Sequence, residues 1–411
     1  MAESFQKPRP GDRLLTVEEA QEQVLAEVGL LDAEEVALAE AHGRVLREDV
    51  AAPFDVPEGD NSAMDGYAVR AADVPGSLRV IEDVPAGRVA SLRVEPGTAI
   101  RIMTGALLPH GADAVAQVEI TDGGSSTVRV LQALAAGANV RQRGEDMQAG
   151  SLVLRAGAPI GAAELGVLAG VQKARVLVSR RPTVAILSTG DELVEVDQPR
   201  APGKVVNSNA YALAALVRET GAEAHVMGIV PDERAATIAA IESALECDFV
   251  LSSGGVSVGA FDFVKDALDA LGAETKFWRV AMKPGKPVVL SRLRGRLYFG
   301  LPGNPVSSMV SFLLFVAPSL RKAMGRSGEL LPPIIMTRLS APLSSRGDRR
   351  TYLRVRVSAV DGELIAAPMR AQGSGVSTSM VGANGLAILE QGVTSAAAGE
   401  PVRTVLFGGV A

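Results

Sequence analysis

The sequence predicts a multidomain α/β protein with a doubly wound parallel sheet, a β-rich domain, an elongated α+β domain and a small all-β C-terminal domain. The chain has 411 residues, which is too long for one ordinary hydrophobic core. Across residues 183–271, short apolar runs alternate with helical patterns, as in βαβ units. In residues 51–144 and 331–411, short β-type runs are instead separated by Pro and Gly.

The N-terminal part predicts helices. Thr16 and Glu19 have the spacing of a capping box, apolar residues then recur at helical intervals, and Gly29 ends the pattern. A second helix is expected over residues 32–42. Residues 145–178 contain a β-type run (152–154) and a helical pattern (162–172). Because residues 145–178 lie between two domains and can pack back on the N-terminal helices, we assign residues 8–50 and 145–178 to one discontinuous domain.

Residues 51–144 are expected to form the β-rich domain, with β-type runs at 67–69, 78–81, 99–102, 114–116 and 128–131. The domain carries the string Asp-Asn-Ser-Ala-Met-Asp-Gly-Tyr-Ala-Val over residues 60–69. Its Asn-Ser and Asp-Gly pairs require turns, so a rigid loop without a ligand is the alternative interpretation. Loops at 102–106 and 143–146 add a hydroxyl group and carboxylates.

Residues 179–330 are expected to form the doubly wound domain. It has strands at 183–187, 225–230 and 249–251 and helices at 208–220, 233–245 and 263–271. Such sheets bind ligands outside the carboxyl ends of their strands. After two Pro residues, alternating runs at 334–336, 352–357, 387–389 and 402–405 predict a small β-barrel-like domain over residues 331–411.

The most informative segment, residues 252–262, contains three glycines and three serines between an apolar strand and a helical pattern. Such a turn exposes backbone N–H groups beside a helix N-terminus, which favours an anion. Asp262 at its end is a hard oxygen ligand suited to Mg²⁺. A tight strand-to-helix connection without a ligand is the alternative.

Charged residues also follow the other strands. Asp191 and Glu192 come after the first strand and Asp232 after the second, while Lys283, Lys286 and the segment 300–305 follow later. Taken singly, these are turn residues, a helix cap and solvated charges. Taken together, carboxylates at one sheet edge would repel without a cation, and the lysines would attract an oxyanion. A metal ion bridging phosphate oxygens would use all of them.

Composition excludes several classes. The net charge of −6 argues against a nucleic-acid partner, and a single cysteine, Cys247, excludes an internal disulfide or Cys-based zinc site. The three histidines lie far apart. The polar N-terminus lacks a signal-peptide apolar region, and the longest apolar run, residues 309–318, is too short to span a membrane. We expect a cytoplasmic protein without a membrane partner.

Five strings in this order resemble the molybdopterin molybdenumtransferase family (MoeA-type enzymes and the gephyrin E domain). They are Asn-Ser-Ala-Met-Asp-Gly-Tyr-Ala from residue 61, Ser-Thr-Gly-Asp-Glu-Leu from 188, Ser-Gly-Gly-Val-Ser-Val-Gly from 253, Met-Lys-Pro-Gly-Lys-Pro from 282 and Gly-Leu-Pro-Gly-Asn-Pro-Val-Ser from 300. The resemblance covers nearly the whole chain.

The resemblance implies the last step of molybdenum cofactor biosynthesis. Molybdate is inserted into the dithiolene of adenylylated molybdopterin with Mg²⁺, and AMP is released. It also implies a MogA-like doubly wound domain and a homodimer whose active site is shared between subunits. The discontinuous domain of residues 8–50 and 145–178 would be its elongated linker and dimerisation domain. Molybdopterin adenylyltransferase and molybdoenzymes or their chaperones would be transient partners. A non-catalytic molybdopterin-binding scaffold and a tungstate-preferring paralogue are the alternatives.

The resemblance also implies roles for individual residues. The implied catalytic residues are Asp65, Thr104, Asp146, Glu192, Asp232, Asp262 and Lys283, and the implied metal ligands are Asp232 and Asp262. The implied substrate-binding residues are Gly254, Gly255, Ser257, Lys286, Pro302, Pro305, Arg350 and Ser374. The chain departs from the family pattern at Gly59, Asn207 and Ala260.

Overall fold

The computed structural model describes residues 14–199, 201–255 and 263–410. The chain forms two compact units. The first comprises Met1–Glu35, Gly43–Arg47 and Leu177–Ala411, and the second comprises Val36–His42 and Glu48–Val176. Each is described by itself.

The centre of the first unit is a six-stranded sheet in the order β15-β12-β16-β20-β19-β17. The strands are β12 (Thr183–Thr189), β15 (Glu223–Val230), β16 (Phe249–Ser253), β17 (Glu274–Arg279), β19 (Pro287–Leu293) and β20 (Arg296–Leu301). The first four in the order run parallel, and three of them, β15, β12 and β16, were predicted. The sequence did not predict β20, nor β19 and β17, which add an antiparallel edge.

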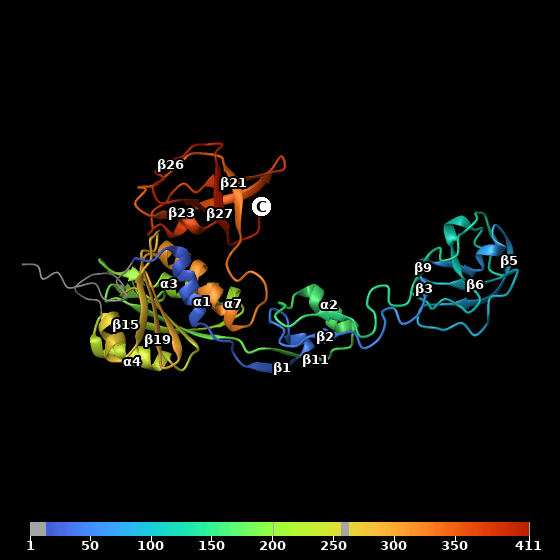
Figure 1. The fold of residues 1–411 in the computed structure, drawn as a ribbon, viewed down its shortest axis with the longest axis horizontal. Coiled ribbons are helices and arrows are strands. Elements are labelled where there is room, and N and C mark those ends of the chain that lie inside the picture. Colours follow the sequence, from blue (N-terminus) through green and yellow to red (C-terminus); the bar gives the residue numbers. More distant parts are fainter. Residues whose placement is uncertain (1–13, 200, 256–262, 411) are drawn as a thin grey trace, which may run out of the picture. The chain divides into compact units, whose positions relative to one another are not determined.

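Helices cover both faces because successive side chains of a buried strand point in opposite directions. Val184 and Ile186 face a core formed with α1 (Val17–Glu27), α3 (Ser208–Glu219), α6 (Pro305–Ser311) and α7 (Ala317–Ala323). Ala185 and Leu187 face a second core with α4 (Arg234–Ala244) and α5 (Phe263–Ala270). In Figure 1, β15 and β19 run between α4 and the group of α1, α3 and α7. This doubly wound arrangement confirms the predicted fold class.

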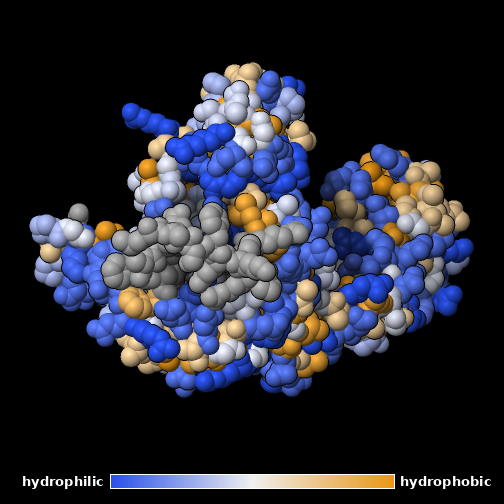
Figure 2. Space-filling model, turned by 60° about the vertical axis from the view of Figure 1, so that its left-hand side comes forward, coloured by the Kyte–Doolittle hydropathy of each residue, from blue (hydrophilic) through white to orange (hydrophobic). Residues whose placement is uncertain are grey.

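One described helix is long and apolar enough to cross a membrane by length and composition. It runs over Pro305–Ala323 through α6, a π-helical turn (Phe312–Val316) and α7, and 78% of its most apolar stretch is buried inside the protein. It therefore packs as a central helix of the first core. On the face drawn in Figure 2, hydrophilic residues predominate and hydrophobic ones lie among them.

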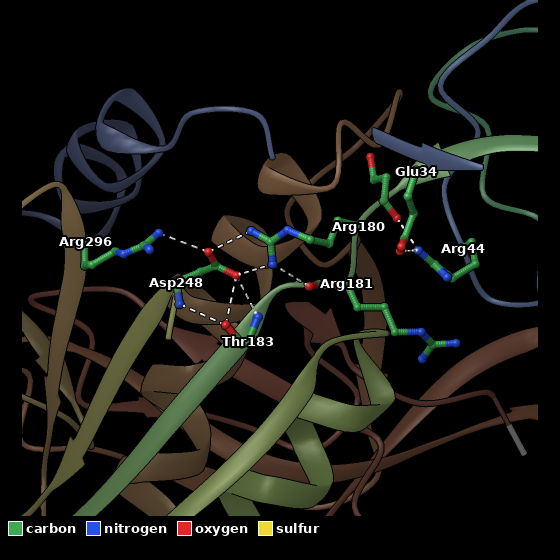
Figure 3. A network of polar contacts seen from close by, with 8 residues as sticks. Glu34, Arg44, Arg180, Arg181, Thr183, Asp248 and Arg296 are labelled. Atoms are coloured by element: carbon green, nitrogen blue, oxygen red, sulfur yellow. Dashed lines mark hydrogen bonds and ion pairs between the residues drawn. The ribbon is translucent and has the colours of Figure 1, made fainter. Parts of the chain in front are cut away.

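A buried carboxylate holds the amino-terminal ends of β12 and β16 together (Figure 3). Asp248, of which 7% is exposed, accepts two 2.8 Å hydrogen bonds from Arg180 and one of 3.1 Å from Arg296. The backbone N–H and hydroxyl of Thr183 also donate to it, at 2.9 and 3.0 Å. Burial alone would raise the pKa of Asp248, but these hydrogen bonds outweigh it and lower the pKa.

The C-terminal part of the first unit is a small closed barrel. Its strands are β21 (Ile334–Leu339), β23 (Arg350–Val360), β24 (Glu363–Pro368), β25 (Gly385–Leu389) and β27 (Pro401–Leu406). They pair in the order β23-β24-β21-β27-β25, and β25 pairs again with β23 to close the ring. The short strand β18 (Met282–Lys283) runs beside β23, with Lys283 opposite Thr351. This pairing joins the sheet domain to the barrel.

The second unit contains a five-stranded sheet in the order β7-β4-β6-β5-β8. The strands are β4 (Gly66–Val69), β5 (Gly76–Val84), β6 (Thr98–Ile102), β7 (Ala114–Gln117) and β8 (Thr127–Val130). Tyr67 and Val69 face one core and Ala68 faces another. The unit also holds the short pairs of β3 (Asn61–Ser62) with β9 (Val140–Arg141) and of β2 (Val50–Ala51) with β10 (Leu152–Leu154), and helix α2 (Ala162–Gly170).

The expected helix over residues 32–42 is wrong. The segment instead forms strand β1 (Ala33–Ala37), paired with β11 (Arg175–Ser179), and a short 3₁₀ turn, Leu38–Glu40. The sequence has high local helix propensity, but pairing with a distant strand overrides it. The capping box of α1 is confirmed, since Thr16 and Glu19 bond to each other's backbone N–H groups at 3.2 and 2.9 Å.

Candidate active site

A cavity of about 510 Å³ opens at the carboxyl ends of β12 and β16, where the parallel-sheet rule places ligands. We call it the strand-end cavity. Its lining combines the ends of these strands with the first residues of α3 and α6. The residues that line it are Ser188, Thr189, Glu192, Leu193, Val205, Val206, Asn207, Ser208, Asn209, Ser253, Gly254, Gly303, Asn304, Pro305 and Gly375.

The turn at Gly254 and Gly255 requires glycine. Both residues have positive φ, of 97° and 64°. A Cβ atom at Gly254 would lie 2.6 Å from the backbone oxygen of Thr189, and one at Gly255 would lie 2.8 Å from the hydroxyl of Thr189. The backbone therefore turns directly against the end of β12, and a larger residue would displace it.

Two asparagines connect the elements around this cavity. Asn209 donates hydrogen bonds to the Ser253 hydroxyl at 2.8 Å and to the Gly303 carbonyl at 2.7 Å. Asn304, at the start of α6, donates to the Ser374 hydroxyl at 3.2 Å. The side chains thus hold the two helix N-termini at the ends of the strands, and Asn304 also lines the neighbouring cavity.

Buried polar groups in the strand-end cavity are left without partners. Ser188 donates to Asn207 Oδ1 at 2.9 Å, but Asn207 Nδ2 and Thr189 Oγ1 find no hydrogen-bond partner in the described part of the chain. The two residues are only 2% and 7% exposed. Because buried polar groups are nearly always paired in folded proteins, these atoms indicate room for a ligand or water.

Carboxylates gather beside this cavity. Asp191 and Asp232 bond reciprocally, with each backbone N–H donating to the other carboxylate at 3.3 and 3.1 Å. Burial raises the pKa of Asp232, and the charges of Asp191 and Glu192 raise it further. Glu192 lines the cavity, whereas Asp232 does not. Among the described residues no group of three or more His, Cys, Asp or Glu is arranged to hold a metal ion.

A second cavity, of about 480 Å³, lies between the sheet domain and the barrel, and we call it the interdomain cavity. The predicted residues Lys283, Lys286, Pro302 and Ser374 all line it. Arg349 and Arg354 of the barrel line it from the other side. Four cationic side chains therefore converge on one space, and this suits an oxyanion.

Arg354 is the most unusual of these cations. It is 1% exposed, and its guanidinium donates to the Ser379 hydroxyl and to the carbonyls of Ala371 and Gly373 at 3.1–3.3 Å. No carboxylate of the described residues pairs with it. Burial lowers the pKa of Arg354 to about 10, which still leaves it protonated at neutral pH. A buried, unpaired cation beside a cavity favours an anionic ligand.

The structure places the side chain of Arg350 outside both cavities. Its guanidinium pairs with Glu18 of α1 and, at 2.7 Å, with Glu390 after β25. Burial alone would lower the pKa of Arg350, but these hydrogen bonds outweigh it and raise the pKa. The neighbouring Arg349, which directly precedes β23, lines the interdomain cavity instead. Arg350 therefore ties the barrel to α1.

The second unit brings Asp65 and Thr104 together, as predicted from distant loops. The backbone N–H and the hydroxyl of Thr104 both donate to Asp65 Oδ1 at 2.7 Å, and together they lower the pKa of Asp65. Gly66 is required next to it, because a Cβ there would lie 2.0 Å from the backbone oxygen of Ala116. The Asp-Gly pair thus fixes an exposed, ionised carboxylate at the start of β4.

Asp146 lines a separate cavity of about 540 Å³ in the second unit, with Asn61, Arg141 and Glu145. Asn61 Oδ1 is buried and has no partner in the described part of the chain. Two of the predicted residues, Ser257 and Asp262, lie outside the described residues, so their contribution stays a prediction. Most of the other predicted residues lie at the two cavities of the first unit or in the loops of the second, whereas Asp232 and Arg350 line neither cavity.

Three family models match consecutive parts of the chain. The MoeA N-terminal region (domain I and II) matches residues 15–171, the probable molybdopterin binding domain matches 185–322, and the MoeA C-terminal region (domain IV) matches 337–407. The chain is 42% identical over 385 residues to the molybdopterin molybdenumtransferase of Nostoc sp., covering 90% of this chain and 88% of that protein. The chain belongs to the MoeA family.

Other MoeA relatives agree. The molybdopterin molybdenumtransferase of Bacillus subtilis is 36% identical, with 92% of this chain and 90% of that protein covered. The crystal structure of the molybdopterin biosynthesis MoeA protein from Pyrococcus horikoshii OT3 is 31% identical, with a TM-score of 0.81. The match covers 96% of this chain and all of that one.

Sequence reasoning missed several cavity residues of this MoeA chain. Asn209, Arg349 and Arg354 lie outside the motifs, and Asn304 lies within one of them but was given no role. An Asn-Ser-Asn string opening a helix was the available signal for the first of these. Arg354 could not be picked out from the sequence. It shares one face of the predicted strand with Arg356, and nothing in the sequence shows which of the two is buried at a cavity.

Proposed function

We propose that this chain is a molybdopterin molybdenumtransferase that inserts molybdate into adenylylated molybdopterin and releases AMP. The family makes it a transferase of molybdenum cofactor biosynthesis. The observation that carries the finer proposal is the pair of adjoining cavities that share Asn304. One has a glycine turn and two helix N-termini, and the other has four cationic side chains.

The strand-end cavity suits the nucleotide-bearing part of the substrate. Backbone N–H groups at a positive-φ turn and at helix N-termini bind phosphate without needing a cationic side chain. The interdomain cavity suits molybdate, since Lys283, Lys286, Arg349 and Arg354 would balance the charge of a tetrahedral oxyanion. Because the two cavities adjoin, the oxyanion and the pterin can meet at their boundary. Catalysis then comes mainly from positioning and electrostatics.

Mg²⁺ is part of this proposal. Hard carboxylate oxygens are the ligands that Mg²⁺ prefers, and Asp232, which lies beside Asp191 at the ends of the strands, would offer one of them. Burial and, after it, the charges of Asp191 and Glu192 raise the pKa of Asp232, and a divalent cation would relieve this destabilisation of its ionised form. Asp232 would hold the ion, with Asp262 as the second predicted ligand. When bound, the ion would offset the charge of the phosphate oxygens.

A homodimer with a shared site also belongs to the proposal. The family resemblance assigns Asp65, Thr104 and Asp146 to the substrate site, and all three lie in loops of the second unit. A partner copy would bring them to the substrate. We expect transient contacts with molybdopterin adenylyltransferase and with molybdoenzymes or their chaperones, in the cytoplasm. Sedimentation that gives a monomer at micromolar concentration would refute the shared site.

The test is a turnover assay with adenylylated molybdopterin, Mg²⁺ and either molybdate or tungstate. We expect AMP formation that depends on the oxyanion and that needs a higher molybdate concentration in Lys283→Met. Binding without AMP would support a scaffold. AMP formed faster with tungstate at equal concentration would support the paralogue.

A further inference from the structure

Asn207 is an asparagine at the start of a helix that does not cap it. An N-cap side chain normally accepts a hydrogen bond from the first turn of its helix. Asn207 makes no such bond, because its Oδ1 accepts from Ser188 at 2.9 Å instead. Its backbone N–H donates to the Val194 carbonyl at 2.9 Å. The residue is thus held firmly, while the first turn of α3 keeps its positive end uncapped.

The amide group of Asn207 is the second observation. Nδ2 lacks an acceptor in the described part of the chain, and the residue is only 2% exposed, so water at the protein surface does not supply one. Oδ1 already accepts the hydrogen bond from Ser188, so the two N–H groups of the amide are the free ones. Thr189 adds a buried hydroxyl that is also unpartnered. Both residues line the strand-end cavity.

The free groups are mostly donors. Of the described residues that line the strand-end cavity, Glu192 alone carries a charge. A ligand held here is therefore recognised by neutral donors and helix ends, not by cations. That chemistry matches a phosphate oxygen, whereas the cation-rich interdomain cavity matches a free oxyanion.

We propose that Asn207 is a specificity-determining residue, whose amide and the adjacent Thr189 hydroxyl donate hydrogen bonds to a phosphate of the substrate at the uncapped start of α3. This rests on the proposed function. It separates two kinds of anion: Asn207 selects the phosphate ester, and the cations of the interdomain cavity select the molybdate. The phosphate is either that of the adenylyl group or the terminal phosphate of the pterin.

Isothermal titration of the full-length protein with AMP, adenosine and molybdopterin tests this. Asn207→Asp keeps the shape but replaces donors by a negative acceptor, and Gln198→Glu makes the same charge change at an exposed site of the same unit. Since a hydrogen bond to a charged group is involved, we expect Asn207→Asp to weaken phosphate-ester binding about ten- to hundredfold. Adenosine binding and the control should be unchanged.

The titrations with AMP and with molybdopterin distinguish the two phosphates that Asn207 could bind. A loss for AMP assigns the adenylyl phosphate, and a loss for molybdopterin assigns the terminal phosphate. Asn207→Ser and Thr189→Val, which keep the protein neutral, should each weaken the same ligand severalfold if Asn207→Asp does not fold. Unchanged binding of both phosphate esters by the folded variants would overturn the proposal. So would a wild-type protein that binds AMP no better than adenosine and does not bind molybdopterin. An absence of AMP release in the turnover assay would instead refute the proposed function.

Discussion

Replacing Asp248 by Asn tests how the sheet that carries the site is held together. The change keeps the shape but removes a charge that is 5% exposed and faces two guanidinium groups. Breaking a buried ion pair from one side costs about 3–5 kcal/mol. Here the side chains of Arg180 and Arg296 remain 36% and 40% exposed, so water offsets part of the loss. We expect the free energy of unfolding to fall by about 2–3 kcal/mol.

Urea unfolding followed by circular dichroism measures this change, with the first unit's transition assigned by the fluorescence of Trp278. Glu242→Gln is the matched control, because its pair with Arg294 is exposed on both sides and should contribute below about 1 kcal/mol. A loss for Asp248→Asn no larger than that of the control would refute the reasoning.

The pH dependence gives an independent check. Since the folded pKa of Asp248 is lowered, its stabilisation is fully present above the unfolded pKa of about 3.9 and is lost as the pH falls through the folded value. The difference between wild type and Asp248→Asn should therefore be constant at neutral pH and shrink below about pH 4. A difference that grows on acidification would contradict the assigned direction.

Three further outcomes are expected. Lys283→Met should weaken molybdate binding about tenfold, measured by titration calorimetry, because one of several cations is lost; unchanged affinity would exclude the interdomain cavity. Arg350→Met should lower stability by about 1 kcal/mol, since its partners Glu18 and Glu390 are substantially exposed, but should leave molybdate affinity within twofold. Thr104→Val should raise the pKa of Asp65 in an NMR titration, because one of its two donors is removed, and should move the acid limb of activity to higher pH.

The parallel strands and most helices could be predicted because their apolar spacing is local. The period of the runs at 183–187 and 249–251 matches a strand buried on both faces, and the structure agrees. The helix expected over residues 32–42 failed since β1 gains its stability from β11, which is more than a hundred residues away. The antiparallel edge of β19 and β17 was missed because a short apolar run does not show which strand it pairs with or in which direction the pair runs.

Site residues in glycine- and proline-rich strings were predictable, because such strings have few structural uses. Lys283 and Gly254 belong to such strings, and both line cavities. Arg350 shows the limit, because its carboxylate partners, Glu18 and Glu390, come from parts of the chain far from it in sequence. The burial of Arg354 could not be predicted, because the hydrogen-bond acceptors of its guanidinium come from the separate segment 371–379.

The ratio of AMP released to molybdenum retained on the pterin tests the central claim most directly. The proposed reaction couples the two events, so quantifying AMP by chromatography and molybdenum by mass spectrometry in one sample should give about one of each per turnover. AMP without pterin-bound molybdenum, or bound substrate that yields neither product, would contradict the account.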